Sequence, residues 1–243
     1  MKPENTPTIL SDAALSADRT ASPAQRGKIP LAAKIAYTAF VAVLVPIYLR
    51  DYGPTNFLYF CDVSLILTLA GVWLENSLLI SMCSVGLLLP QFLWLADFLT
   101  SMVGLHLTGM TNYMFDGNIP LFTRGLSLFH GWLPLLLVWL LARVGYDQRA
   151  LPAWTILATA LVVVCYFFLP PAGAHLADSK IPVNINYVYG FDDKQPQHWV
   201  SPNLYVAIWI ALLTLAAYIP THLVLRKVYR PAICRPMKQL TVP

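Results

Sequence analysis

Three residues in two apolar stretches of the sequence have side chains that could do chemistry together. Cys61 and Asp62 lie in "NFLYFCDVSLILTL", and His130 lies in "RGLSLFHGWLPLLLVW". A thiol beside an imidazole can form a thiolate–imidazolium pair, which is the nucleophile of thiol acyl transfer. A carboxylate can orient the imidazole of such a pair. We therefore take Cys61, His130 and Asp62 as candidate catalytic residues. An acyl lipid is the candidate substrate, because both stretches are apolar enough to lie in a membrane.

The composition of the chain indicates an integral membrane protein. Of its 243 residues, 57% are hydrophobic and 12% are charged, whereas soluble domains carry about 25% charged residues. The net charge is +4, and its basic residues fall near predicted membrane ends, so we expect no nucleic-acid partner. Protein partners are left open, and membrane lipids are the expected partners.

The sequence gives no pattern for a metal or a cofactor. The four cysteines form no CxxC or comparable spacing, and a zinc site needs several His, Cys or carboxylate ligands. His130 is the one histidine well inside a predicted span. No Gly-rich phosphate loop or dinucleotide fingerprint is present. We therefore expect neither a metal nor a cofactor.

The apolar stretches predict an all-α, polytopic bundle of six transmembrane helices. A transmembrane helix needs about 20 predominantly apolar residues. Six stretches meet this length, at 31–49, 55–74, 78–99, 121–143, 153–170 and 203–225. They make up a transmembrane domain at 30–226, between a polar, disordered tail at 1–29 and a basic tail at 227–243. The residues "ENS" at 75–77 predict a tight turn, and 101–120 and 171–202 predict longer loops.

The distribution of basic residues predicts the orientation. Six spans place both termini on one side, which the positive-inside rule identifies as the cytoplasm. Twelve Lys and Arg lie on the side of the termini: Lys2, Arg19, Arg26, Lys28, Lys34, Arg143, Arg149, Arg226, Lys227, Arg230, Arg235 and Lys238. Four lie on the other side: Arg50, Arg124, Lys180 and Lys194. This bias predicts a multi-pass protein of the plasma (inner) membrane with both termini in the cytoplasm.

Further polar side chains gather in the outer halves of predicted spans three and four. Gln91 and Asp97 lie on one slowly rotating face of span three, and Arg124 and Ser127 lie outward of His130 on span four. Polar groups at membrane depth are costly and often mark sites. The pattern predicts a pocket that opens outward, with Gln91, Asp97, Arg124 and Ser127 as candidate substrate-binding residues. An interfacial ion pair is the alternative explanation for Asp97 and Arg124.

The segment "PVNINYVYG" at 182–190 is too apolar for a solvated linker. Its β-branched and aromatic residues alternate with asparagines. We predict that it packs over the mouth of the bundle, with Asn184 or Asn186 hydrogen-bonded toward the pocket. Asn184, Asn186 and Tyr187 are accordingly candidate substrate-binding residues.

The imidazole of His130 should have polar partners, because a neutral ring inside a span loses its hydrogen bonds to water. The polar residues of span two lie at a slightly shallower depth. We therefore predict that spans two and four are neighbours. We also predict that His130 lies within one side-chain length of Cys61 or Asp62.

These stretches together resemble a group of bacterial six-span membrane proteins and, more remotely, the YwaF-like integral membrane family, over roughly 55–225. That family carries "CD" on an early span, a histidine on a middle span and "NY" before the last. The matching residues are Cys61 with Asp62, His130, and Asn186 with Tyr187. A eukaryotic relative of the family is an acyltransferase of ether phospholipids with a cysteine nucleophile. The similar androgen-induced lipid hydrolases use a threonine. The resemblance therefore implies acyl-lipid chemistry, although the segment "TGMTNYMFDGNIPLF" departs from the family pattern.

Two other functions fit the same residues. The first is a non-enzymatic transporter or binding protein in which Asp62, Asp97 and His130 form a proton or ligand relay. The second is a membrane scaffold whose tails and loops dock other chains. A hydrogen bond between the sulfur and the imidazole would favour the enzyme, and a continuous polar path to the cytoplasm would favour the transporter.

Overall fold

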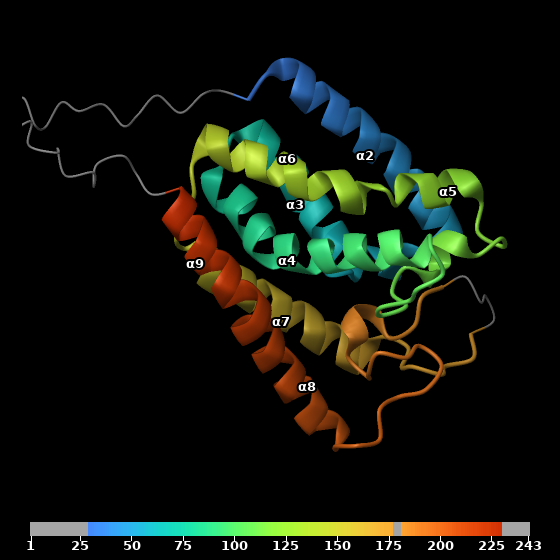
Figure 1. Ribbon diagram of the computed structural model, residues 1–243. Helices are drawn as coiled ribbons and strands as arrows, with labels where there is room; N and C mark the ends of the chain where they lie inside the picture. The colour runs from blue at the N-terminus through green and yellow to red at the C-terminus, as the bar shows by residue number, and fades with distance from the viewer. Residues whose placement is uncertain (1–28, 177–180, 230–243) are drawn as a thin grey trace, which may run out of the picture.

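The computed structural model describes residues 29–176 and 181–229, and these residues contain helices and no strands (Figure 1). The prediction of an all-α fold is confirmed. The elements are α2 (Leu31–Tyr52), η2 (Pro54–Leu58), α3 (Phe60–Leu74), α4 (Ser77–Ser101), η3 (Asn112–Phe115), α5 (Leu121–Leu126), α6 (Phe129–Val144), α7 (Ala150–Phe168), η4 (Ile185–Tyr187), α8 (Pro202–Leu212), the π-helical segment η5 (Leu213–Tyr218) and α9 (Ile219–Val228).

The helices match the six predicted spans to within a few residues. Five are long and apolar enough to cross a membrane: Leu31–Tyr52, Ser77–Ser101, Leu121–Val144, Ala150–Phe168 and Pro202–Val228. The sixth, Phe60–Leu74, is apolar but shorter, and at 1.5 Å per residue it extends about 22 Å. The predicted tail at 1–29 lies outside the described residues except for its last residue, and the basic tail is described only to residue 229.

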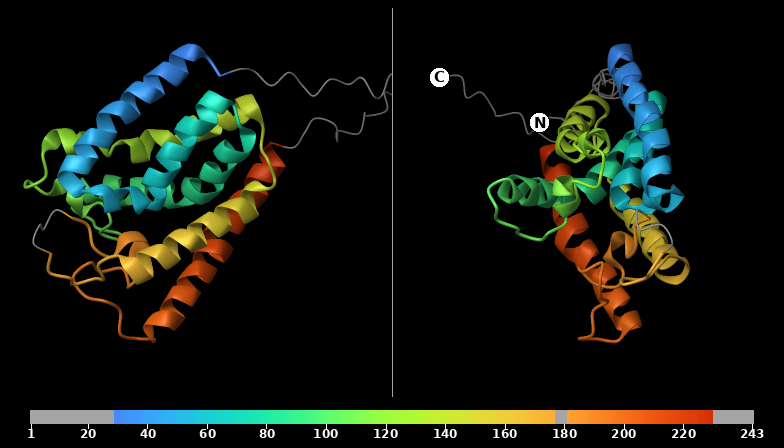
Figure 2. Two further views of the ribbon diagram at one scale, coloured as in Figure 1. Left: turned by 180° about the vertical axis from the view of Figure 1, so that it is seen from behind. Right: turned by 90° about the vertical axis from the view of Figure 1, so that its right-hand side faces the viewer.

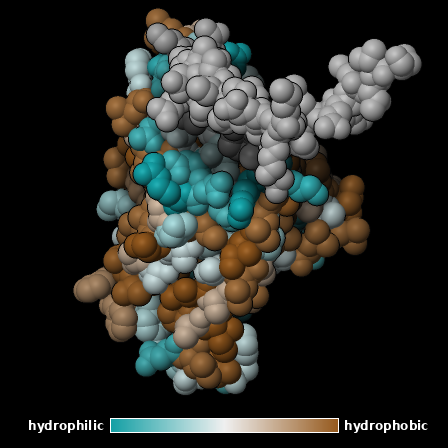
Figure 3. All heavy atoms as spheres, turned by 90° about the vertical axis from the view of Figure 1, so that its left-hand side faces the viewer, coloured by the Kyte–Doolittle hydropathy of each residue, from teal (hydrophilic) through white to brown (hydrophobic). Residues whose placement is uncertain are grey.

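The two ends of the bundle differ. The "turn end" carries the short connections 75–76 and 145–149, and the "loop end" carries 102–120 and 169–201 (Figure 1). At the turn end, Glu75 adopts a left-handed conformation (φ 49°) and the Asn76 side chain accepts a hydrogen bond from Leu79 N at 3.1 Å. The predicted tight turn is therefore confirmed. Figure 3 shows hydrophilic residues in the middle of the turn end and hydrophobic residues on its flanks, as expected for a bundle in a membrane.

Helix α4 is the centre of the bundle. It packs most extensively against α6 and α3, and it also contacts α7, η5 and α9. On α6, the side chains of Leu133, Leu137, Leu140 and Leu141 repeat at helical spacing and are fully buried. By contrast, α2 and the α8–α9 helix lie at the two sides of the bundle (Figure 2) and keep most of their apolar side chains exposed.

Three of the six spans are not regular helices, although the sequence predicts a regular helix for each. The second span is divided at Tyr59, which has extended backbone between η2 and α3. The fourth is interrupted between Leu126 and Phe129. The sixth contains the π-helical turn directly before Pro220. Proline has no N–H to donate to the preceding turn, and such interruptions are common next to it.

Candidate functional site

The first turn of α3 places Cys61 and Asp62 at the loop end. Asp62 is 3% exposed. Its Oδ2 accepts a hydrogen bond from Asn56 Nδ2 at 3.1 Å and lies 4.0 Å from the Cys61 sulfur. Its Oδ1 is buried and has no hydrogen-bond partner among the described residues. Leaving a buried acceptor without a donor costs about 1–3 kcal/mol, and more for a charged group.

Asn186 ties the segment 182–190 to the break before α3. Its Oδ1 accepts from Phe60 N at 3.0 Å, and its Nδ2 donates to Leu58 O at 2.8 Å. It is 3% exposed and adopts a left-handed backbone (φ 59°), which asparagine tolerates better than most residues. The prediction that this segment packs over the bundle is confirmed. The Asn186 side chain thus bonds the backbone groups on either side of Tyr59, where the second span is interrupted.

Asn184 and Tyr187 organise the segment itself. Asn184 Nδ2 donates to Gly190 O at 2.9 Å, and its Oδ1 accepts from Tyr189 N at 2.9 Å. The carbonyl of Tyr187 accepts from Tyr205 Oη at 3.1 Å. These bonds fold the loop and hold it against α8.

Two tyrosines that the sequence analysis did not single out lie beside Ser127. The Tyr48 hydroxyl and Ser127 Oγ are 2.6 Å apart. The Tyr113 hydroxyl, from the segment after α4, lies near the side chains of Ser127, Trp94 and Cys61. Burial raises the pKa of Tyr113, so this phenol stays a neutral donor. A tyrosine in an apparently polar loop gives no signal in a single sequence, which is why Tyr113 was missed.

His130 follows the interruption of the fourth span and hydrogen-bonds to it. Its Nδ1 lies 2.7 Å from the carbonyl oxygen of Ser127. A carbonyl only accepts, so Nδ1 carries the proton and Nε2 is left as an acceptor. The ring stacks on Trp94, with centroids 4.8 Å apart. A histidine at this depth is therefore explained in part by the carbonyl that the interrupted helix exposes.

The structure gives His130 partners other than Cys61 and Asp62. No hydrogen bond joins it to either residue, although all three lie in the described part of the chain. Helix α4 packs against both α3 and α6, which contact each other only slightly. Spans two and four, which we predicted to be neighbours, therefore make only a minor contact.

Asp97 is fully buried and binds the loop that follows its own helix. Its Oδ1 accepts from Thr108 N at 2.7 Å and Gly109 N at 3.2 Å. Its Oδ2 accepts from Thr111 N at 3.0 Å and Thr111 Oγ1 at 2.6 Å. Arg124 instead donates to Met114 O at 3.0 Å and to a second loop carbonyl, that of residue 119, at 3.1 Å. The alternative of an ion pair between Asp97 and Arg124 is therefore wrong.

Several buried polar atoms at the loop end lack a partner within the described residues. Besides Asp62 Oδ1, they include Gln91 Oε1, Trp94 Nε1 and the Tyr52 hydroxyl. Tyr52 lies close enough to Asp62 to interact with its charge. Buried polar groups in proteins are nearly always hydrogen-bonded. Unpartnered buried atoms also occur elsewhere in the described bundle, such as Thr68 Oγ1 and Trp154 Nε1, so the distinguishing feature of the loop end is that one of its unpartnered atoms, Asp62 Oδ1, belongs to a carboxylate.

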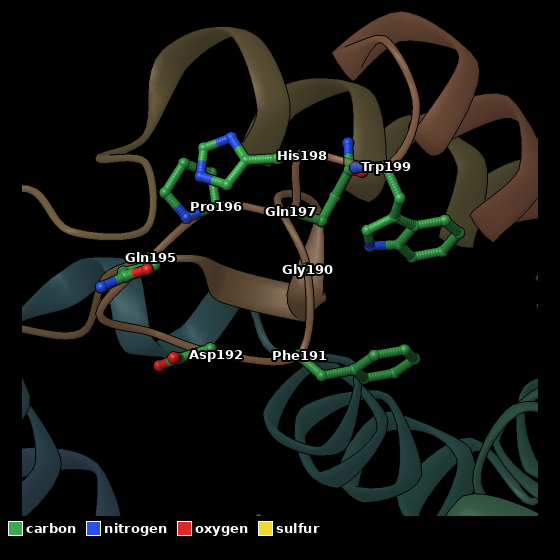
Figure 4. Close-up of a pocket in the computed structure, with 8 residues that line it drawn as sticks. All are labelled: Gly190, Phe191, Asp192, Gln195, Pro196, Gln197, His198 and Trp199. Atoms are coloured by element: carbon green, nitrogen blue, oxygen red, sulfur yellow. The ribbon is translucent and has the colours of Figure 1, made fainter.

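A separate hollow of 640 Å³ lies in the loop 190–199. Figure 4 shows the rings of Phe191 and Trp199 projecting to one side of it, with Asp192 and Gln195 projecting to the other. Phe191 and Trp199 are exposed, which is usual for aromatic side chains at a membrane interface. The residues that line this hollow include none of the predicted site residues.

The fold and its apolar surface define a helical bundle of the integral membrane class, with a group of buried polar side chains at one end. No family model, no curated protein and no solved structure matches the chain. The case for a function therefore depends on the geometry of the loop end.

Proposed function

We propose that the protein binds a small amphiphilic molecule at the loop end of α3, with Asp62 receiving a donor or cationic group of that ligand. The observation that carries this proposal is the buried Oδ1 of Asp62, which has no partner in the described structure. A carboxyl group in an apolar medium is costly unless it is paired or hydrogen-bonded. A ligand ammonium or hydroxyl group would supply the missing donor.

The backbone around Asp62 supports a binding role. Non-helical backbone at membrane depth is tolerated where protein covers it or where it lines a cavity, and interrupted helices build the binding sites of many transporters. Here η2 and the extended Tyr59 precede α3 directly. The Asn186 contact covers this break from one side, while Asp62 lies within the first turn after it.

The side of the membrane and the source of the ligand follow from the predicted orientation. With both termini in the cytoplasm of a plasma-membrane protein, the loop end faces outward and Asp62 lies in the outer half of the bilayer. Membrane lipids with an amine or hydroxyl headgroup are then the nearest source of a ligand. This role is non-enzymatic.

The test compares three single-chain amphiphiles of equal length: decylamine, decanol and decanoate. Thermal unfolding of the purified protein is followed with each compound, because a ligand that binds only the folded state raises its stability by RT ln(1 + [L]/Kd). We expect decylamine to raise the melting temperature of the wild type and not that of Asp62→Asn. Asp116→Asn is the matched control, because Asp116 is an exposed acid of the same end. Equal shifts in the wild type and Asp62→Asn, or a larger shift with decanoate, contradict the proposal.

A second candidate function is acyl-lipid transfer or hydrolysis by Cys61 and His130, as the resemblance to the YwaF-like family implies. The observation that favours it is the bond from His130 Nδ1 to a carbonyl, which leaves Nε2 free as a base. In the reaction, Nε2 would take the thiol proton while sulfur attacks the ester carbonyl. The imidazolium would then return the proton to the departing alcohol, and water or a second alcohol would release the acyl group from the thioester. This mechanism requires His130 to approach Cys61.

The labelling rate of Cys61 separates the second function from a structural role of His130. A long-chain maleimide is used in membranes, with Cys61→Ser as the control for labelling at the other cysteines. If the pair is catalytic, His130→Ala should lower the labelling rate at least tenfold, in addition to any loss of stability from the Ser127 and Trp94 contacts. If His130 only binds the Ser127 carbonyl, the same substitution should lower the melting temperature and leave the labelling rate unchanged.

A further inference from the structure

The loop that follows α4 exposes apolar side chains and satisfies its polar groups internally. Four side chains of the segment 102–107 are more than half exposed: Met102 (62%), Val103 (74%), Leu105 (64%) and Leu107 (58%). Leu121 and Phe122, where the chain enters α5, are also exposed. The sequence analysis predicted a longer loop at 101–120, and this half of it presents apolar side chains at its surface.

The polar side chains of the same loop are directed to one another. Ser101 Oγ lies 3.2 Å from His106 Nδ1 and 3.3 Å from Thr111 Oγ1. Thr111 in turn donates to Asp97. A loop in water usually has the opposite arrangement, because polar side chains there gain nothing from turning inward.

Backbone N–H groups on both sides of His106 and Leu107 are also bonded internally. The N–H groups of residues 102–105 donate to carbonyls of residues 98–101. Those of Thr108, Gly109 and Thr111 donate to the Asp97 carboxylate. Lipid offers no hydrogen bonds, so non-helical backbone next to lipid needs internal partners of this kind. The Asp97 carboxylate is the partner of the N–H groups of residues 108, 109 and 111, which gives this buried carboxylate a defined role.

We propose that the 102–107 loop is inserted into the interfacial region of the bilayer and contacts the acyl chains of the adjacent leaflet. The loop continues the lipid-facing surface of α4, where Phe92, Leu93 and Leu99 are about half exposed. In the right-hand view of Figure 2, the segment after α4 curves out to one side of the bundle. Apart from His106, its exposed side chains are apolar, and acyl chains are the partner that such a surface fits. This inference does not depend on ligand binding at Asp62.

Spin labels at single cysteines test the insertion in phosphatidylcholine vesicles. Leu105→Cys and Leu107→Cys are made in the full chain with the native cysteines replaced, and Gln195→Cys is the control because Gln195 is a polar residue of the other loop. Oxygen, which partitions into lipid, should relax the labels at 105 and 107 more strongly than a water-soluble nickel chelate does. The label at 195 should show the reverse.

Two outcomes overturn the proposal: labels at 105 and 107 that behave like the label at 195, or labels that neither reagent reaches, which would mean that protein covers the loop. If the cysteine-free chain fails to fold, Leu105→Trp in the natural chain replaces it. The added tryptophan emission should then be quenched by lipids brominated near the top of the acyl chain. Quenching only by acrylamide in water contradicts the insertion.

Discussion

Replacing Asn186 by glycine should loosen the first turn of α3 without disturbing the backbone conformation at 186. Glycine adopts the positive φ of this position without strain, so the change removes the amide contacts alone. Phe60 N and Leu58 O then lose partners at 3.0 and 2.8 Å. Each unsatisfied buried group costs about 1–3 kcal/mol, which gives roughly 2–4 kcal/mol for the pair after partial relaxation.

Amide hydrogen exchange in nanodiscs measures this loss directly. A decrease of 2–4 kcal/mol in the opening free energy corresponds to exchange roughly 30-fold to several-hundred-fold faster at Phe60, since 1.4 kcal/mol is a factor of ten. Labelling of Cys61 should accelerate as well, because its turn opens with the same motion. Asn118→Gly, in an exposed turn of the other loop, should leave both rates unchanged. Unaltered protection at Phe60 in Asn186→Gly would refute the assignment of Asn186 as the group that stabilises this turn.

Two further predictions concern packing and topology. Gly86→Ala should lower the free energy of unfolding by about 1–3 kcal/mol, because its Cβ would overlap the fully buried indole of Trp154. Gly125→Ala, where the Cβ meets nothing within 4 Å, should be neutral or stabilising in the same thermal unfolding assay, and equal behaviour of the two variants contradicts this packing argument. A membrane-impermeant maleimide applied to intact cells should label Gln195→Cys and not Gln148→Cys if the termini are cytoplasmic, and the reverse pattern would invert the orientation.

The six spans could be predicted from the sequence because their hydrophobicity is strong and continuous. Their interruptions could not, and the break before α3 shows why, because its partner is distant in the chain. The break at Tyr59 is stabilised by Asn186, 126 residues beyond the Phe60 amide that it binds. Apolar composition alone does not distinguish a continuous helix from an interrupted one.

The candidate site remains a prediction, and the structure shows which contacts its residues make. Polar residues do gather at the loop end, and Asp62 is among them. It could be singled out from the sequence because charged residues are rare in apolar spans. Spacing along one helix, however, does not establish contact with another helix. Asp97 proved to bind its own following loop, and His130 proved to bind the Ser127 carbonyl of its own span.

The position of α4 also constrains the order in which the protein can assemble during synthesis. Of its two most extensive partners, α3 is translated before it and α6 after it, and the Trp154 side chain that fills the space beside Gly86 also comes later. The donors to Asp97, by contrast, lie only 11 to 14 residues further along, so this carboxylate can be satisfied almost as soon as α4 leaves the ribosome. Gln91 has no such local partner for its side-chain oxygen. We therefore expect α4 to remain with the insertion machinery until α6 and α7 arrive, and a nascent chain truncated before residue 121 should be a substrate for membrane quality-control proteases.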